Sequence, residues 1–361
     1  MEDPIIARAQ SATQGDGRPA RPRPGRYPGP GKVLTPSGEA PTIGRVPAPE
    51  DVRLPLVSIV TPSLNQGRFI TDTIESIRAQ DYPRIEHIVV DGGSRDETPE
   101  VVARYLDRLT WISGPDSGQS QAINRGFRMA SGEIVSWLNT DDRLLPGAVR
   151  AVVDAFLADP GLMMVYGDGD LIDAEGRKLW PFRFTEPFNL RRLIEVGDYI
   201  LQPAAFVRRE AIEAVEYLDE DLHWCMDWDL WIRIGQRFRV RYLPVPLAQA
   251  RIHPDAKTSR GGFAIIREMH RIIRRHSRRW VPPILVIHGG SVLYRLGCRA
   301  VGHSPDRPGA GPGGRPLGGR RWASRMVDRV YETGRLPWEW TPDPELRRPT
   351  TASGDEAARA T

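Results

Sequence analysis

Two adjacent carboxylates, Asp141 and Asp142, follow an apolar run that extends from Glu133 to Leu138. Like charges side by side repel and are costly to desolvate, so a pair in this position is typical of a site that holds a divalent cation. A second interpretation is a solvated turn with an aspartate at a helix N-terminus, because Pro146 soon opens a helical segment. These residues alone leave both interpretations open.

The chain before this pair alternates between short apolar runs and segments with helical spacing. Strands are expected at 56–60, 85–90, 109–112 and 134–138, and helices at 69–80, 98–109 and 120–130. Strands that alternate with helices of this length predict an α/β fold of Rossmann-like type, with a mostly parallel sheet covered by helices on both faces.

Polar clusters follow three of these strands, at 61–63, 91–94 and 139–142. Ligands of open α/β sheets bind outside the carboxyl ends of the strands. Because all three clusters lie at such ends, the sequence predicts a ligand site at this edge of the sheet. That convergence favours the cation-binding interpretation of Asp141.

The two ends of the chain differ in composition from its middle. The 35 glycines and 33 prolines among 361 residues concentrate there. Residues 1–52 hold few apolar side chains, which predicts a disordered tail with no apolar core of a signal peptide. The expected order is a single domain at 53–260, a C-terminal segment at 261–302, and a linker and tail at 303–361.

The charge balance and the cysteines limit the function classes. The formal net charge is +4 and the isoelectric point about 9.2, which is mildly basic and not typical of a nucleic-acid binder. Cys225 and Cys298 form neither metal-ligand spacing nor a disulfide framework, which suits a reducing compartment. We therefore expect a cytoplasmic protein that does not bind nucleic acid.

Five motifs occur in order along the first half of the chain. They are Val57 to Asn65, Ile74 to Pro83, His87 to Asp96, Asp116 to Phe127, and Ala130 to Glu133. Together they closely resemble the family 2 glycosyltransferases of GT-A fold, over roughly residues 54–259. The resemblance implies transfer of a sugar, with inversion, from a nucleotide-diphosphate donor to a hydroxyl acceptor. A UDP-sugar is the expected donor, and a glycan or polyprenyl-linked molecule in surface polysaccharide synthesis is the expected acceptor.

The resemblance also implies donor-binding roles. Pro62 and Asp91 match positions that hold the nucleotide base, and Asp116 with Asn124 and Arg125 matches the segment that lines the nucleotide and diphosphate. Asp168 is expected near the donor sugar, with a tight turn as its alternative. Lys257 is expected to neutralise charge on the leaving group. The remaining expected donor contacts are Asn65, Asn139 and Asp142.

The segment Asn139-Thr140-Asp141 matches the family's Asp-x-Asp metal motif, with Asn139 in place of the first aspartate. An amide can still accept from ribose hydroxyls or ligate weakly through its carbonyl, which leaves Asp141 as the main expected metal ligand. His253 lies in a segment that resembles the family's closing Arg-x-His, where the histidine reaches the metal or diphosphate; a solvated loop histidine is the alternative. Hard oxygen ligands and a diphosphate suit Mg²⁺ or Mn²⁺.

The segment Asp227 to Arg233 resembles the family's Glu-Asp-x-Asp-Leu-Trp pattern, with Met226 in place of the glutamate. Asp227 keeps the position of the expected catalytic base, held ionised by a helix N-terminus; the alternative is a helix cap. Asp229 is expected to be a structural partner of a nearby arginine or backbone amide. The expected acceptor contacts are Gln202, Trp224 and Trp228, with simple packing as the alternative for both tryptophans.

Residues 263–280 form an amphipathic pattern with a basic face. It is either a helix packed on the domain with a solvated face, or a peripheral contact with anionic membrane at the inner face of the plasma membrane. Residues 281–296 are apolar but too interrupted to span a bilayer. Two alternative functions are considered. A nucleotidyltransferase would need a glycine-rich loop with a lysine after the first strand, and residues 65–68 do not form one. A non-catalytic nucleotide-sugar binding protein is suggested by Asn139 and Met226.

Overall fold

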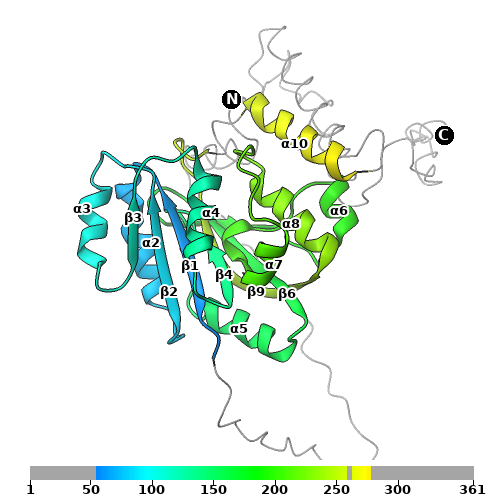
Figure 1. The fold of residues 1–361 in the computed structure, drawn as a ribbon, viewed down its shortest axis with the longest axis horizontal. Coiled ribbons are helices and arrows are strands. Elements are labelled where there is room, and N and C mark those ends of the chain that lie inside the picture. Colours follow the sequence, from blue (N-terminus) through cyan, green and yellow to red (C-terminus); the bar gives the residue numbers. More distant parts are fainter. Residues whose placement is uncertain (1–53, 258–261, 278–361) are drawn as a thin grey trace, which may run out of the picture. The chain divides into compact units, whose positions relative to one another are not determined.

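The computed structural model describes residues 54–257 and 262–277 (Figure 1). The strands are β1 Val57–Ser63, β2 Ile85–Asp91, β3 Thr110–Ser113, β4 Ile134–Trp137, β5 Arg143–Leu144, β6 Leu162–Ile172, β7 Lys178–Pro181, β8 Ala205–Arg208 and β9 Arg239–Arg251. The helices are α2 Gly67–Arg78, α3 Thr98–Val102, α4 Gln119–Met129, α5 Ala148–Ala158, α6 Leu190–Glu195, α7 Arg209–Ala214, α8 Met226–Arg237 and α10 Gly262–His276, with 3-10 turns η1 Ala103–Tyr105 and η2 Gln202–Ala204. The predicted tail at 1–52, the broken apolar segment at 281–296 and the linker and tail at 303–361 lie outside the described residues.

In the described part of the chain, the strands form one sheet in the order β3-β2-β1-β4-β8-β6-β9-β5, and β7 pairs with β6. β1 runs parallel to β2 and to β4, and β2 runs parallel to β3. Helices α2, α3 and α4 connect these strands, as expected of parallel neighbours, which need crossover connections. The predicted α/β fold with a mostly parallel sheet and flanking helices is confirmed.

The second half of the sheet is mixed, a feature that the sequence pattern did not predict. β8 lies antiparallel between β4 and β6, whereas β9 runs parallel to β6. The β6–β9 register shifts on both sides of Asp168, whose partner is Pro246. Proline cannot donate to a strand ladder and is tolerated at such irregularities.

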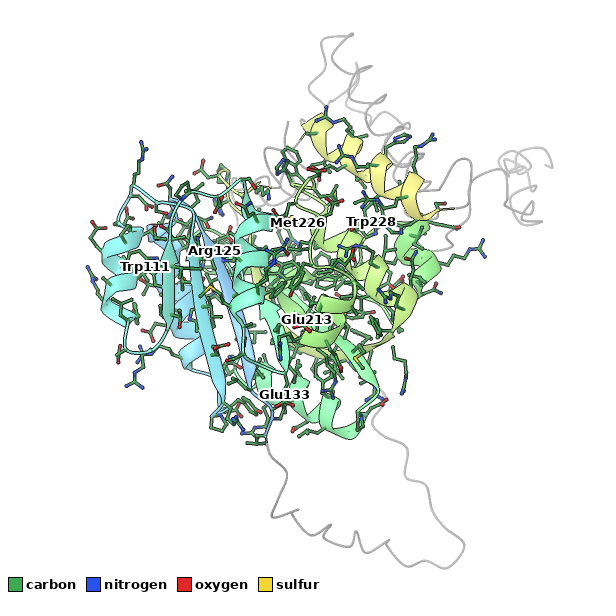
Figure 2. The ribbon with its side chains drawn as sticks, viewed as in Figure 1. Trp111, Arg125, Glu133, Glu213, Met226 and Trp228 are labelled. Carbon is green, nitrogen blue, oxygen red and sulfur yellow. The ribbon has the colours of Figure 1, made fainter. Side chains whose placement is uncertain are left out.

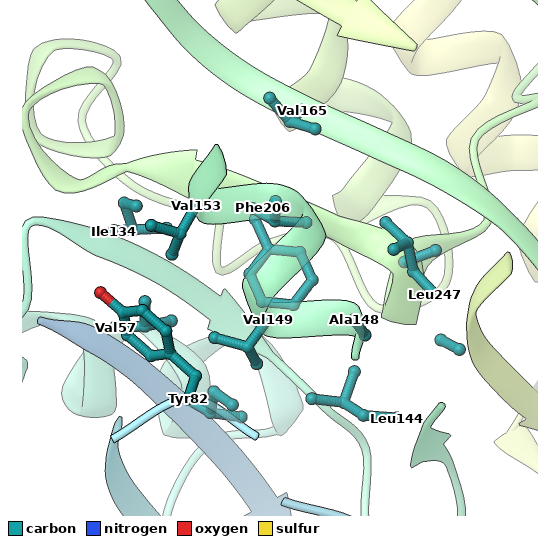
Figure 3. Close-up of a cluster of buried hydrophobic side chains, with 14 of the residues drawn as sticks. Val57, Tyr82, Ile134, Leu144, Ala148, Val149, Val153, Val165, Phe206 and Leu247 are labelled. Carbon is teal, nitrogen blue, oxygen red and sulfur yellow. The ribbon is translucent and has the colours of Figure 1, made fainter. Parts of the chain in front are cut away.

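Helices cover both faces of the sheet. On one face, α5 contributes Val149 and Val153 to a cluster that also contains Val57 and Ile134 (Figure 3). On the other face, α4 approaches β1 so closely that a methyl group on Gly126 would lie 2.3 Å from a Val60 side-chain carbon. Because Val57 and Val60 differ by an odd number of positions, they point to opposite faces of β1.

One predicted helix is shorter than expected. The sequence pattern predicted a helix over 98–109, but α3 ends at Val102 and a 3-10 turn follows at Ala103–Tyr105. The reason is burial: Leu106, expected on the apolar face, is 52% exposed. Beyond Val102, Tyr105 and Leu109 still pack on a core cluster, but the exposed Leu106 adds no apolar contact that would hold further α-helical turns.

The chain divides into two compact units, which are described separately. The sheet unit contains described residues 54–187, 200–257 and 262–265, and the second unit contains 188–199 and 266–277. The second unit holds α6 and most of α10, whose exposed residues include the arginines Arg267, Arg271, Arg274 and Arg275. α10 corresponds to the amphipathic helix predicted over 263–280. None of the described helices is long and apolar enough to cross a membrane.

Candidate active site

Buried hydroxyl groups join the carboxyl ends of β1 and β4. The strand order reverses between these strands, because β2 and β3 lie on one side of β1 and β4 lies on the other. Thr140 Oγ1 donates to the Pro62 carbonyl oxygen at 2.6 Å, and Thr73 Oγ1 on α2 donates to the Thr140 carbonyl oxygen at 2.6 Å. Two of the polar clusters therefore meet at a switch point, the place where such sheets bind ligands.

Asp91, at the end of β2, is fully buried and accepts several hydrogen bonds. Its Oδ2 accepts from Ser113 Oγ at 2.6 Å and from Ser94 N at 3.0 Å. Asn65 connects this loop to the end of β1, because its N donates to Ser94 Oγ at 2.7 Å and its Oδ1 accepts from Arg95 N at 2.8 Å. Asn65 has a φ of 53°, in the left-handed region that asparagine tolerates. The loops after β1 and β2 thus form one hydrogen-bonded unit.

Asp116 lies against the backbone of the Asp91 loop. A methyl group on Gly92 would lie 2.8 Å from Asp116 Oδ2, and Asp116 Oδ1 accepts from Gly118 N at 3.0 Å. Burial raises the pKa of Asp116 above its ordinary value, while the bond from Gly118 opposes the shift. The negative charge of Asp91 raises this pKa further, and Arg125, exposed on α4 (Figure 2), lowers it.

Asp141 and His253, the two predicted metal ligands, lie side by side. Asp141 Oδ2 is 3.0 Å from His253 Nε2. The His253 ring is buried, and its centroid lies 4.7 Å from that of Phe69 on α2. The structure therefore brings both predicted ligands to the same point at the edge of the sheet.

Arg251, at the end of β9, fixes the segment that carries these carboxylates. Its N donates to Asp142 Oδ1 at 2.9 Å, and its Nε donates to the Asp141 carbonyl oxygen at 2.8 Å. Its Nη2 donates to Asp72 Oδ2 on α2 at 2.9 Å. Burial raises the pKa of Asp142 well above its usual range, and the charge of Asp141 adds to the shift. Arg251 was not among the predicted site residues, although it opens the motif that contains His253.

Asn139 lies in a network of side-chain amides. Its Oδ1 accepts from Gln119 Nε2 at 2.8 Å, and its Nδ2 donates to Gln202 Oε1 at 3.0 Å and to Asp142 Oδ2 at 3.1 Å. Lys257 Nζ in turn donates to Gln119 Oε1 at 2.6 Å. Asn139 thus connects two predicted site residues, Asp142 and Gln202, directly. A third, Lys257, is connected through Gln119, which was not among the predicted site residues.

The first turn of α8 carries Asp227, the predicted base. Its side chain is half-buried, and its Oδ1 accepts from Trp228 N at 2.9 Å, a bond that favours the ionised carboxylate. Asp229 is fully buried and pairs with Arg233 at 2.7 Å, as the sequence predicted. Trp228 (Figure 2) is 2% exposed, which favours the packing alternative for this residue. Trp224 is half-buried on the preceding loop.

Helix α4 positions the loop that leads into α8. Ser120 Oγ donates to the Leu222 carbonyl oxygen at 2.7 Å. The Asn124 side chain donates to the Leu218 carbonyl oxygen at 3.0 Å and accepts from Leu218 N at 3.0 Å. Asn124 also donates to Glu220 Oε1 at 2.9 Å. Its amide is therefore used to hold the 218–222 segment.

Asp168, predicted near the donor sugar, lies on β6 opposite β9. Its Oδ1 accepts from Tyr242 OH at 2.8 Å. Burial, together with this hydrogen bond and the charge of Asp168, raises the pKa of Tyr242 to about 12.

The chemistry of the donor set determines whether a metal fits. Within residues 54–257 and 262–277, no group of three or more His, Cys, Asp or Glu side chains could hold a metal ion. Asp141 and His253 nevertheless offer an oxygen and a nitrogen at adjacent positions. Mg²⁺ is usually bound by one or two carboxylates together with substrate phosphates. The residues present therefore fit a divalent cation that shares its coordination with a bound diphosphate.

A family model described as glycosyl transferase family 2 matches residues 58–232. An uncharacterized glycosyltransferase of Mycobacterium tuberculosis (strain CDC 1551 / Oshkosh) is 32% identical over 187 residues, which are 50% of this chain and 68% of that protein. The chain therefore belongs to glycosyl transferase family 2, and the resemblance that its motifs indicated is confirmed.

Other relatives are longer than this chain. The O-antigen biosynthesis protein RfbC of Myxococcus xanthus is 32% identical over 219 residues, 58% of this chain and 17% of that protein. An uncharacterized glycosyltransferase of Rickettsia bellii is 28% identical over 209 residues, 56% of this chain and 30% of that protein. The chain thus spans less than a third of the length of these two relatives.

Among solved structures, the 1–349 fragment of S. aureus TarS in complex with UDP-GlcNAc has a TM-score of 0.51 to this chain. The two are 19% identical, and the match covers 69% of this chain and 73% of the other. At this identity the similarity supports the fold alone, which is that of a GT-A glycosyltransferase.

Proposed function

We propose that this glycosyltransferase transfers a sugar from a nucleotide-diphosphate donor, with a UDP-sugar as the expected substrate, to a hydroxyl acceptor with inversion. The observation that carries the proposal is the contact of Asp141 with His253, where the carboxyl ends of β4 and β9 meet. A carboxylate and an imidazole that lie side by side can hold the cation that accompanies a nucleotide diphosphate. Nucleotide-diphosphate sugars are the donor class that family membership implies.

In this proposal the donor nucleotide lies along the loops that follow β1 and β2. Pro62, Asn65 and Asp91 border the base, and Asp116 and Arg125 border the ribose and diphosphate. The bonds from Ser113 and Ser94 fix the Asp91 carboxylate, so little reorganisation is needed when a ligand binds. For Asn124 we propose a positioning role, because its amide is engaged with the 218–222 segment. In the same proposal, Asp168 borders the donor sugar.

Asp141 and His253 would hold Mg²⁺ or Mn²⁺, with Asp142 behind them. When bound, the cation supplies positive charge at the diphosphate, where negative charge develops as the leaving group departs. Lys257 contributes a further positive charge, and its contact with Gln119 places it beside Asn139. These residues together would stabilise the leaving nucleoside diphosphate.

Asp227 is the proposed general base. The acceptor oxygen forms a bond to the anomeric carbon while the bond from that carbon to the diphosphate oxygen breaks and its electron pair stays on the diphosphate. Asp227 takes the acceptor hydroxyl proton in the same step. Attack from the side opposite the leaving group inverts the anomeric centre. Its place in the first turn of α8 favours the charged form that accepts the proton.

The proposed acceptor is a glycan or a polyprenyl-linked molecule in surface polysaccharide synthesis, with Gln202 and Trp224 as its proposed contacts. The name of the Myxococcus xanthus relative, an O-antigen biosynthesis protein, supports this context. The exposed arginines of α10 support contact with an anionic membrane at its cytoplasmic face. We propose no nucleic-acid partner.

The full-length protein should be incubated with UDP-sugars, Mn²⁺ and a polyprenyl-linked glycan acceptor. The expected result is release of UDP together with a product whose anomeric configuration, read by NMR, is opposite to that of the donor. Retained configuration would contradict inversion. Tight binding of UDP-sugars with neither transfer nor UDP release would instead favour the non-catalytic alternative.

A further inference from the structure

Gln119 joins Lys257 to Asn139 in a series of hydrogen bonds that runs across the candidate site in one direction. Lys257 Nζ donates to Gln119 Oε1 at 2.6 Å, and Gln119 Nε2 donates to Asn139 Oδ1 at 2.8 Å. Asn139 Nδ2 then donates to Asp142 Oδ2 at 3.1 Å and to Gln202 Oε1 at 3.0 Å. Lys257 and Gln119 are 138 residues apart in the sequence, so these hydrogen bonds connect distant segments of the protein.

The two ends of this series fix the direction of every bond in it. A lysine ammonium can only donate, so the oxygen of Gln119 must face it and the Gln119 nitrogen must face Asn139. At the other end, Gln202 Nε2 donates to the Trp137 carbonyl oxygen at 2.8 Å, and a carbonyl can only accept. The Gln202 oxygen must therefore face Asn139, which requires the Asn139 nitrogen at that point.

Only an amide can occupy position 139 in this arrangement. An aspartate there would still accept from Gln119, but it would offer no proton to Asp142 or to Gln202. It would also set one carboxylate oxygen against another at the present 3.1 Å contact with Asp142, in place of the amide donor that stands there now. The departure of Asn139 from the family's Asp-x-Asp motif is therefore matched by its neighbours.

We propose that Gln119 is a positioning residue of the donor site, and that Asn139 serves the same network instead of binding metal. The network holds Lys257 at the start of α4 and holds the Asn139 to Asp142 segment against Gln202. Gln119 thereby links the proposed leaving-group charge to the proposed metal-binding segment. This inference rests on the proposed function, because the donor defines what is positioned.

The test measures UDP binding in the presence of Mn²⁺ by calorimetry on the full chain, together with thermal melts. Gln119→Ala should weaken UDP binding about tenfold, equivalent to about 1.4 kcal/mol, with little change in melting temperature because Gln119 is only half-buried. Gln121→Ala is the matched control. Gln121 is also a half-buried glutamine of α4 with two hydrogen bonds, but these go to Ser117 and Glu220.

Lys257→Met should weaken UDP binding as well. In the double variant with Gln119→Ala, the total loss of binding free energy should be smaller than the sum of the two single losses. Non-additivity of this kind is expected of residues in one network. Asn139→Asp should lower the melting temperature and weaken UDP binding, and adding Asp142→Asn should restore part of the melting temperature. That double change returns one donor and one acceptor to the 139–142 contact.

Tighter UDP binding by Asn139→Asp would overturn the inference, since it would make position 139 a metal ligand. Equal UDP affinity of Gln119→Ala and wild type would also overturn it, and the proposed function would stand. Failure of the wild type to bind UDP, GDP or dTDP would contradict both.

Discussion

Asp141 Oδ2 lies 3.0 Å from His253 Nε2, although 112 residues separate the two in the chain. The contact joins the segments that follow two strands of the sheet, because Asp141 follows β4 and His253 follows β9. Arg251, two residues before His253, holds the two segments together by bonding the backbone of Asp141 and the side chain of Asp142. The proposed metal site is therefore built by the second half of the sheet as much as by the first.

Metal removal tests this site directly. Binding of UDP should weaken at least about tenfold in EDTA, a loss of about 1.4 kcal/mol, because the diphosphate loses its shared cation. Asp141→Asn should show weak binding with and without metal. Asp255→Asn, an exposed aspartate on the same segment as His253, is the control and should behave as wild type. Calorimetry that gave equal affinity with and without metal would count against Asp141 as a ligand.

Asp227→Asn keeps the shape of the side chain and removes the charge that accepts the proton. Transfer should fall by roughly two to four orders of magnitude, the usual contribution of a positioned base. UDP affinity should stay near that of wild type, because other residues bind the donor. Asp221→Asn, an exposed aspartate on the loop before α8, serves as the control. Near wild-type transfer by Asp227→Asn would place the base elsewhere.

Asp229→Asn should act on stability instead. Asp229 is fully buried and bonds the Arg233 guanidinium at 2.7 Å, so the substitution leaves a positive group without its charge partner. The free energy of unfolding should fall by about 2 kcal/mol. This is less than the cost of breaking a fully buried ion pair, because the Arg233 side chain is 20% exposed. Chemical denaturation measures this, and UDP affinity should be retained. An unchanged unfolding midpoint would show that the pair adds nothing.

The local features of this fold were predictable from the sequence, and the long-range ones were not. The apolar run at 134–138 and the helical spacing at 120–130 depend on neighbouring residues, and β4 and α4 lie there. The antiparallel direction of β8 depends on which strands flank it, which no local pattern encodes. The predicted extension of α3 failed for a related reason, since the exposure of Leu106 is decided by tertiary packing.

The same division applies to the candidate site. Asp141 and His253 were predicted because each lies in a motif of the family, and the structure then brought them together. Gln119 was missed because its role depends on Lys257, a residue far away in the chain that folding brings within 2.6 Å. From the sequence, Asn139 was interpreted as a weak metal ligand. The structure shows that its side-chain amide bonds Gln119, Asp142 and Gln202.

His87 gives the protein a pH dependence of stability that is separate from the active site. It is buried on β2, with Nε2 2.9 Å from Thr61 Oγ1, and burial lowers its pKa from 6.5 to about 3. Between these two values the unfolded chain binds a proton that the folded chain does not, so stability from this group is fully present above about pH 6.5 and is lost as the pH falls. The free energy of unfolding should be about 2 kcal/mol lower at about pH 5 than at about pH 7.5 on account of this one residue.

His87→Gln should remove that part of the pH dependence, because glutamine does not titrate and can still bond Thr61. His270→Gln, which changes an exposed histidine of α10, should keep the wild-type dependence. Urea denaturation of the three proteins at both pH values measures the difference. If His87→Gln loses stability between the two pH values as steeply as wild type does, then His87 is protonated in the folded state, or another group causes the acid sensitivity.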